Sequence, residues 1–335
     1  MPRPLLVAPD SFKGTLSAPQ VAQAIERGAR RAGLKQTDLC PVADGGEGTV
    51  EILRAQRGGQ LVPAPATDPL GRPVSAGYAL VDFPGQALTA IVEVADASGL
   101  GRVAEAERDP RAASTAGTGQ LIAAAIDAGA RQILIAAGGS ATTDGGAGAI
   151  AAIAAAGGLR GASLTVLCDV RTPFELAAER FGPQKGARDP ETIRSLARRL
   201  QRLARGWPRD PRGLPMTGAA GGLAGGLWAA LGARLEPGAP FVLAALGFER
   251  RLRASRAVVV GEGRLDHGTL EGKAPAEVAI RARQIGVPAH AIVGVNDLDL
   301  FDARLLDLGL IYEAHDEAEL ERAGWQLGQA IHAAA

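Results

Sequence analysis

The sequence has few of the residues that disulfide scaffolds, zinc sites and membrane spans require. Its 335 residues include two cysteines and four histidines, and they form neither a C-x-x-C pair nor an H-E-x-x-H motif. A disulfide framework and a zinc site are therefore not expected. Apolar runs of about 18 residues and a signal-peptide pattern are also missing. We expect a cytoplasmic protein without a membrane partner.

An excess of charge of one sign is absent as well. The chain has 36 Lys and Arg against 36 Asp and Glu, so long-range attraction to nucleic acid is not expected. Aromatic residues make up only 4%, whereas glycine is abundant at 45 residues. Without a collagen repeat, this much glycine indicates many tight loops. A core of Ala, Leu, Val and Ile suits an α/β protein in which helices pack on a parallel sheet.

Short apolar runs alternate with amphipathic stretches along the chain. The expected strands cover 5–8, 39–42, 74–80, 88–94, 131–137, 164–170, 257–260 and, as the last strand, 289–293. The expected helices cover 18–32, 49–57, 120–128, 147–156, 190–205 and 276–283. Ser17 and Gln20 form a capping box before the first of these helices. The region after Pro63 predicts a hairpin and a change of architecture, so we place a domain boundary there.

Four glycine-containing loops that also carry charged residues follow predicted strands. They are 10–14, 44–48, 139–146 and 262–266. Ligands of open α/β sheets bind at the carboxyl ends of the strands, and glycine lets backbone N–H groups approach an anion closely. Acidic side chains there would bind Mg²⁺ or accept a proton, and Lys and Arg would offset phosphoryl charge. Together these are the parts of a phosphoryl-transfer site.

Structural interpretations of the same loops remain open. A glycine-rich turn is often only a turn, and Asp44 and Asp144 are placed to cap the helices that follow them. The glycine-rich stretch 218–226 suits close helix packing and a nucleotide-facing loop equally well. Neither the P-loop motif nor the dinucleotide-binding motif occurs, so a nucleotide would have to be bound in another way.

Seven motifs, taken together, resemble the bacterial two-domain glycerate kinases of glyoxylate, glucarate and galactarate breakdown. They lie at 8–14, 43–49, 69–74, 117–119, 138–142 with 144–146, 181–186, and 261–266 with 272–275. The motifs occur in the order found in that family and cover nearly the whole chain. Seven ordered motifs are far more specific than any one of them.

This resemblance implies ATP-dependent phosphorylation of D-glycerate with Mg²⁺, usually to 2-phosphoglycerate. It also implies a flavodoxin-like parallel-sheet domain with a second α/β domain inserted, and an active site in the cleft between them. We expect residues 1–63 and 275–335 to form the flavodoxin-like domain and residues 64–274 the inserted one. A 3-kinase and a kinase of another short hydroxy acid remain alternatives. A non-catalytic organic-acid binder is a further alternative, because segment 170–180 departs from the family.

The resemblance and the chemistry of the side chains together give candidate site residues. The candidate catalytic residues are Asp44, Lys13 and Asp266, and the candidate substrate-binding residues are Asp10, Ser11, Arg72 and Arg264. The candidate nucleotide-binding residues are Gly138, Gly139, Ser140, Thr142 and Lys185, and the candidate metal ligands are Asp169 and Glu262. We expect Lys13 and Arg264 to hold the substrate carboxylate. Asp44, in preference to Asp266, is expected to orient or deprotonate the hydroxyl group.

Overall fold

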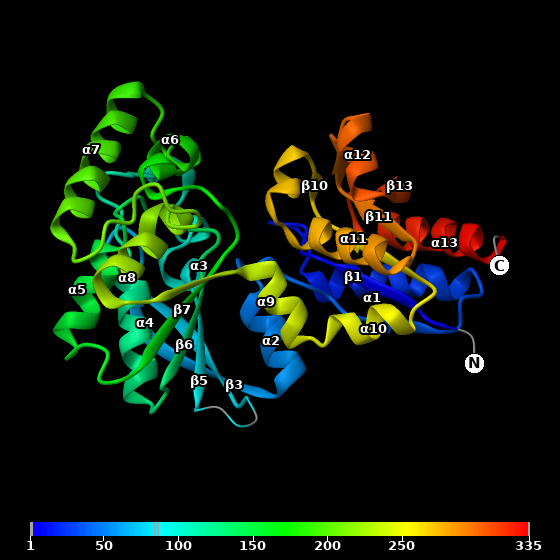
Figure 1. The fold of residues 1–335 in the computed structure, drawn as a ribbon, viewed down its shortest axis with the longest axis horizontal. Coiled ribbons are helices and arrows are strands. Elements are labelled where there is room, and N and C mark those ends of the chain that lie inside the picture. The colour runs from blue at the N-terminus through cyan, green and yellow to red at the C-terminus, as the bar shows by residue number, and fades with distance from the viewer. Residues whose placement is uncertain (1–2, 84, 86, 334–335) are drawn as a thin grey trace. The chain divides into compact units, whose positions relative to one another are not determined.

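The chain divides into two compact units. The computed structural model describes residues 3–83, 85 and 87–333. The first unit comprises Met1–Asp44 and Ala239–Ala335, and the second comprises Gly45–Gly238. In Figure 1 the first unit is blue in its N-terminal part and yellow to red in its C-terminal part, and the second unit is mostly cyan and green.

The first unit is built on a five-stranded parallel sheet with the order β13-β11-β9-β1-β2. Its strands are β1 (Leu5–Pro9), β2 (Thr37–Leu39), β9 (Ala257–Gly261), β11 (Ala289–Val293) and β13 (Leu308–Glu313). Numbered along this unit alone, the order is 2-1-3-4-5, which is the flavodoxin-like order. The predicted flavodoxin-like parallel sheet is therefore confirmed. The prediction that 289–293 is the last strand is wrong, because β13 follows as a half-exposed edge strand with only weak apolar alternation.

Helices surround this sheet and close its core. They are α1 (Ala18–Arg31), α9 (Gly238–Ala245), α10 (Phe248–Ala254), α11 (Ala274–Ile285), α12 (Leu300–Leu306) and α13 (Glu317–Ala333), and the short strands β10 (Arg264–Leu265) and β12 (Val295–Asn296) pair with one another. The predicted capping box is present, since the Ser17 backbone N–H donates to Gln20 Oε1 at 2.9 Å. Val21 and Ile25 of α1 pack with Leu320 of α13 in the buried core.

The second unit contains a six-stranded mixed sheet with the order β3-β4-β5-β6-β7-β8. Its strands are β3 (Gly59–Thr67), β4 (Pro73–Val81), β5 (Thr89–Glu93), β6 (Gln132–Ala136), β7 (Ser163–Cys168) and β8 (Arg234–Pro237). Strands β4 and β5 form the predicted antiparallel hairpin. Strand β3, which was not predicted, pairs antiparallel with β4, and β5 to β8 are mutually parallel. The helices are α2 (Thr49–Arg57), α3 (Val94–Ser98), α4 (Ala116–Asp127), α5 (Ala147–Ala155), α6 (Ala177–Phe181), α7 (Pro190–Gly206) and α8 (Leu223–Leu231).

The limits of the two units differ from the limits expected at 63/64 and 274/275. Strand β9 pairs with β1 over five residues, so it belongs to the sheet of the first unit rather than to the inserted region. Helix α2 and strand β3 fall in the second unit. An apolar run such as Ala257–Val260 has the same local pattern in either sheet, and only its non-local pairing partner assigns it.

Within the described residues, none of the helices is long and apolar enough to cross a membrane.

Candidate active site

The first unit has a pocket at the point where its strand order reverses. Strands β1 and β9 are neighbours there, and the Asp10 N–H donates to Gly261 O at 2.8 Å just beyond both strands. A pocket of about 310 Å³ opens at these carboxyl ends, which is where ligands of open α/β sheets bind. It is lined by Asp10, Ser11, Lys13, Asp44, Glu262, Gly263, Arg264 and Lys273. The structure thus brings together three of the four predicted loops.

Two buried carboxyl groups and one ammonium group line this pocket. Asp10 and Asp44 are 4% and 2% exposed. Burial raises the pKa of Asp10 well above its usual range, and the charge of Asp44 adds to this effect. Lys13 Nζ lies 3.5 Å from Asp44 Oδ2, and its side chain is half exposed. A carboxyl group that holds its proton this tightly is suited to proton transfer.

Glu262 also lines the pocket and is bound by protein donors. Its Oε1 accepts from the Thr269 hydroxyl at 2.6 Å, and its Oε2 lies 3.1 Å from Lys273 Nζ. Burial raises its pKa. Lys273 also lies 3.9 Å from Asp266 Oδ1, and that oxygen is buried with no hydrogen-bond partner among the described residues. Arg264 forms an ion pair with Asp297 at the rim.

In the second unit, the loop between β6 and α5 is held in place by a neighbouring segment. Leu100 N–H donates to Gly139 O at 2.8 Å, and Ala141 N–H donates to Ser98 O at 2.9 Å. Gly138 has to be glycine, since a Cβ there would lie 2.5 Å from Gly46 Cα. In the described part of the chain, the N–H groups of Gly138 and Gly139 have no hydrogen-bond acceptor. These two donors are therefore available to an anion.

Lys185 holds the same loop from another side. Its Nζ donates to Ser140 Oγ at 2.8 Å and to Thr142 O at 2.7 Å, and the residue is 3% exposed. Burial lowers the pKa of this lysine to about 7, although the carboxylates of Asp169 and Asp144 oppose the shift. The predicted nucleotide-binding residues of this loop thus lie together, and Lys185 joins them through protein contacts.

Asp144 has the structural role that the sequence left open. Its carboxylate accepts hydrogen bonds from the Thr115 N–H and hydroxyl, both at 2.9 Å, and from the Gly146 and Gly148 N–H groups at 3.0 and 3.1 Å. The Gly146 and Gly148 donors lie at the amino end of α5, and the Thr115 donors lie at the amino end of α4. Because Asp144 already occupies the Gly146 and Gly148 N–H groups, the amino end of α5 has fewer donors for an external phosphate group.

The glycine-rich stretch 218–226 was expected either to pack closely against other elements or to face a nucleotide. Three of its glycines pack closely against other elements. A Cβ at Gly222 or Gly225 would lie 2.7 or 2.6 Å from the Phe174 ring, and one at Gly226 would lie 2.0 Å from Gly145 O. Gly221 differs, because its Cβ position lies 3.0 Å from Lys185 Nζ and 1.9 Å from Thr142 O. It therefore lies against the loop of the second unit.

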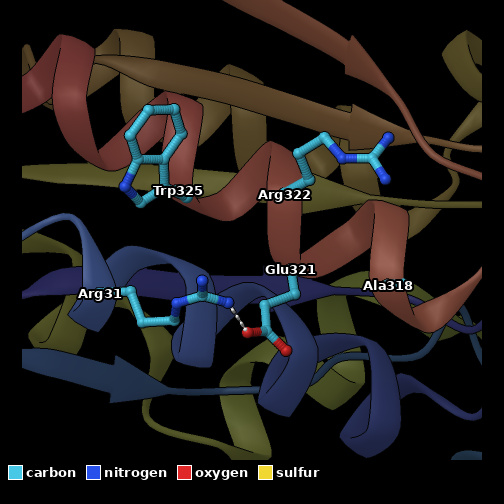
Figure 2. Close-up of a pocket in the computed structure, with 5 residues that line it drawn as sticks. All are labelled: Arg31, Ala318, Glu321, Arg322 and Trp325. Atoms are coloured by element: carbon cyan, nitrogen blue, oxygen red, sulfur yellow. Dashed lines mark hydrogen bonds and ion pairs between the residues drawn. The ribbon is translucent and has the colours of Figure 1, made fainter.

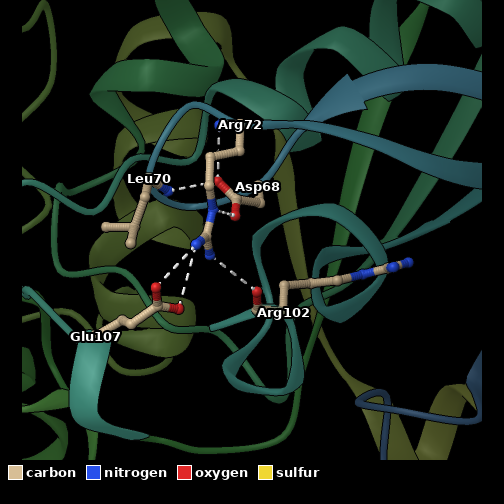
Figure 3. A network of polar contacts seen from close by, with 5 residues as sticks. All are labelled: Asp68, Leu70, Arg72, Arg102 and Glu107. Atoms are coloured by element: carbon tan, nitrogen blue, oxygen red, sulfur yellow. Dashed lines mark hydrogen bonds and ion pairs between the residues drawn. The ribbon is translucent and has the colours of Figure 1, made fainter. Parts of the chain in front are cut away.

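Arg72, a predicted substrate ligand, belongs to the second unit and contacts protein groups (Figure 3). Its Nε donates to Asp68 Oδ2 at 2.6 Å, its Nη1 lies 3.2 Å from both carboxylate oxygens of Glu107, and its Nη2 lies 3.5 Å from Arg102 O. The residues that line the first-unit pocket do not include it.

The two predicted metal ligands differ in how well they suit a metal ion. Among the described residues, no group of three or more His, Cys, Asp or Glu side chains could hold one. Mg²⁺, however, is commonly bound by one or two carboxylates together with substrate phosphates. Asp169 suits this arrangement, since it follows β7 and its Oδ2 lies 3.3 Å from the Cβ position of Gly138. Glu262 does not, because both its oxygens are already bound.

Three further residues border these sites. Lys273, one of the cations that the sequence offered for offsetting phosphoryl charge, lines the first-unit pocket. Glu47 and Glu93 were given no role from the sequence. Glu47 Oε2 lies 3.6 Å from the Cβ position of Gly139. Glu93 ends β5, and its Oε1 accepts from the Val50 N–H at 2.7 Å. Burial raises the pKa of Glu93 to about 7, and its place at the end of a strand beside β6 was the available signal.

A second hollow of the first unit, of about 420 Å³, lies between α1 and α13 (Figure 2). Arg31, Glu321, Arg322 and Trp325 border it, and Arg31 Nη1 is bound to Glu321 Oε1 at 2.5 Å. None of the predicted site residues lies there, and the bordering side chains are exposed or half exposed. We therefore assign the candidate site to the pocket at β1 and β9.

Comparison with known proteins agrees with the motifs. The family model described as the glycerate kinase family matches residues 5–157 and 154–323. The chain belongs to the glycerate kinase family. The predicted enzyme class, a kinase that transfers a phosphoryl group to an alcohol, is therefore confirmed.

Individual members of the family are similar over most of their length. The glycerate kinase of Bacillus subtilis is 39% identical, with 87% of this chain and 84% of that protein covered. The glycerate 2-kinase of Escherichia coli K12 is 38% identical, with 87% and 84% covered. A solved structure from Salmonella typhimurium LT2, described as a proposed glycerate kinase 2, is 34% identical, with a TM-score of 0.80 over 100% of this chain and 99% of that one.

Proposed function

We propose that this glycerate kinase family member transfers the γ-phosphoryl group of ATP to the 2-hydroxyl of D-glycerate and forms 2-phosphoglycerate. The observation that carries the proposal is the first-unit pocket. It places buried carboxyl groups and the cationic side chains of Lys13, Arg264 and Lys273 around one cavity at the strand-order reversal. A small hydroxy acid needs both kinds of group, cations for its carboxylate and a proton acceptor for its hydroxyl.

On the substrate side, Lys13 and Arg264 hold the carboxylate. Both side chains are more than half exposed, at 53% and 58%, so they are accessible to a ligand from solvent. Asp10 accepts the proton of the attacking hydroxyl group, since its raised pKa makes it a stronger base than an ordinary Asp once ionised. Asp44, which the sequence favoured for this role, is paired with Lys13 and orients the ammonium group.

On the nucleotide side, the N–H groups of Gly138 and Gly139 bind phosphate oxygens, as glycine loops commonly do. Asp169 would hold Mg²⁺ together with those oxygens, and the ion would neutralise charge on the phosphate groups. The phosphoryl transition state is loose, so positioning and electrostatic stabilisation provide most of the rate acceleration.

A coupled assay tests this function directly. Purified protein is mixed with D-glycerate and Mg·ATP, and the product is coupled to enolase with and without phosphoglycerate mutase. Formation of 2-phosphoglycerate gives an enolase signal without the mutase. A signal that requires the mutase would instead identify the 3-hydroxyl as the acceptor.

A third result would contradict the kinase proposal itself. If neither coupling gives a signal and no ADP forms, while calorimetry detects glycerate binding, the protein binds organic acids without turnover. ADP formation with other short hydroxy acids, and none with D-glycerate, would move the substrate assignment to those acids.

A further inference from the structure

The β6–α5 loop of the second unit depends on the segment that runs beside it. Residues 98–100 pair with residues 139–141 through the Leu100 and Ala141 N–H groups, and Gly99 and Ser140 form an antiparallel bridge. The Ser98 hydroxyl is in turn bound by the Thr118 hydroxyl at 2.8 Å. The position of the loop therefore follows the position of this segment.

Arg72 binds the same segment at two points further along. Its guanidinium group contacts the Arg102 carbonyl oxygen and the Glu107 carboxylate (Figure 3). At the other end of the segment, Arg108 Nη1 donates to Gln184 O at 3.1 Å, in the turn that carries Lys185. Segment 98–108 thus connects the loop, Arg72 and the Lys185 turn.

The turn that carries Arg72 is fixed by several hydrogen bonds of its own. Asp68 is 2% exposed, and its Oδ1 accepts from the Leu70 and Arg72 N–H groups at 2.8 and 2.9 Å. Ser114 N–H donates to Pro69 O at 2.9 Å, which joins the turn to the residues before α4. A guanidinium group attached to a turn fixed in this way can restrain the segment that it contacts.

The same contacts argue against Arg72 as a ligand for the substrate carboxylate. Nε, Nη1 and Nη2 all face protein oxygens, and two of their partners are carboxylates. A substrate carboxylate would have to displace one of these groups, with little net gain in charge pairing.

We propose that Arg72 is a positioning residue that holds segment 98–108 against the Gly138–Thr142 loop, and that it does not bind the substrate. The proposal rests on the proposed function in one respect, the assignment of that loop to the nucleotide phosphates. Loss of Arg72 then weakens nucleotide use and leaves glycerate binding unchanged.

The test combines amide exchange with steady-state kinetics on Arg72→Ala and Arg72→Lys. Loss of the guanidinium contacts in Arg72→Ala should raise amide exchange at Leu100 and Ala141 about tenfold. It should also raise KM for ATP about fivefold or more, while KM for D-glycerate changes by less than about twofold. Arg72→Lys, which keeps the charge but loses the planar fork, should give an intermediate result. Arg30→Ala, which removes an exposed i,i+4 ion pair with Glu26 in the first unit, is the matched control and should change none of these.

The opposite pattern would overturn the proposal. A KM for D-glycerate raised about tenfold with unchanged exchange at Leu100 and Ala141 would make Arg72 a substrate ligand. Asp68 keeps two backbone donors without the Arg72 side chain, so the variant is expected to fold. Should circular dichroism show otherwise, Glu107→Gln takes its place, and unchanged exchange in that variant also overturns the proposal.

Amide exchange separates this proposal from the proposed function. It reports the link between Arg72 and the loop whether or not the protein phosphorylates glycerate. If the coupled assay shows no turnover while exchange rises in Arg72→Ala, the link is supported and only the kinase assignment fails.

Discussion

Burial and a neighbouring carboxylate together set the properties of Asp10 in the first-unit pocket. Asp10 has lost its water shell and lies near Asp44, and both effects favour its protonated form. Lys13 reaches Asp44 from a half-exposed position. Asp10 and Asp44 each follow a predicted strand, so their sequence context alone does not predict the raised pKa of Asp10.

Asp10→Asn is predicted to lower kcat about a hundredfold, because the variant cannot accept the hydroxyl proton. In the wild type, kcat/KM should fall as pH drops through the raised pKa of Asp10, since the protonated carboxyl group is not a base. The residual activity of the variant should not show this fall of kcat/KM at low pH. Asp127→Asn, at an exposed ion pair with Arg160, is the control. If the fall at low pH is lost in Asp44→Asn and kept in Asp10→Asn, then Asp44 is the proton acceptor and Asp10 is not.

Lys185 is predicted to make stability depend on pH. Its pKa is about 7 in the folded protein against about 10.5 when unfolded, so between these values the unfolded chain binds more protons. Unfolding free energy therefore rises with pH from 7 towards 10.5, by at most about 1.4 kcal/mol per pH unit for one proton. Urea unfolding of the wild type and Lys185→Met at pH 7 and pH 9 measures this. The unfolding free energy of the wild type minus that of Lys185→Met should increase from pH 7 to pH 9. A difference that does not change with pH would contradict the lowered pKa.

At the scale of elements, the close approach of α1 and α13 depends on glycine. A Cβ at Gly28 would lie 1.9 Å from Glu321 O, and one at Gly324 would lie 2.4 Å from Ile25 O. Both contacts are with backbone oxygens, so a change of side-chain rotamer cannot relieve them. Ion pairs of Arg27 and Arg31 with Glu321 lie beside this interface.

Gly28→Ala is accordingly predicted to destabilise the protein by about 1–3 kcal/mol, because the two helices must move apart. Gly206→Ala is the matched control, since it lies at the end of α7 with no atom within 4 Å of its Cβ position. That change should be neutral or stabilise by up to about 1 kcal/mol through the higher helix propensity of Ala. Thermal unfolding of both variants measures the difference, and equal effects would argue against close packing at Gly28.

At the scale of the whole molecule, the two units carry different candidate sites. The pocket that suits a hydroxy acid lies in the first unit, and the loop that suits phosphate groups lies in the second. Each arises at the carboxyl ends of its own parallel strands, where loops and helix starts converge. The proposed reaction therefore takes its substrate-binding residues from one unit and its phosphate-binding residues from the other.

Each ligand is predicted to protect the amides of one unit. D-glycerate should slow amide exchange at Ser11, Lys13 and Gly263, and ADP should slow it at Gly138 and Gly139. Exchange measured with each ligand alone separates the two effects, and Lys13→Met should remove only the effect of glycerate. Protection of the first-unit pocket by ADP alone would contradict the assignment of nucleotide to the second unit.

The sequence by itself determined the family and many of the local elements. Capping, apolar periodicity and glycine stops act within a few residues, so helices such as Thr49–Arg57 and strands such as Ala289–Val293 were predicted with their observed bounds. Seven ordered motifs were enough to indicate a glycerate kinase, because each loop carries its own residue pattern.

Only the tertiary structure decided what the loop residues contact. It paired β9 with β1, closed Asp10, Asp44 and Lys273 around one pocket, and bound Arg72 to Glu107 and Arg102. Strand pairing, burial and ion-pair choice depend on residues distant in the chain, and the same Asp or Arg has different partners and a different pKa in each environment.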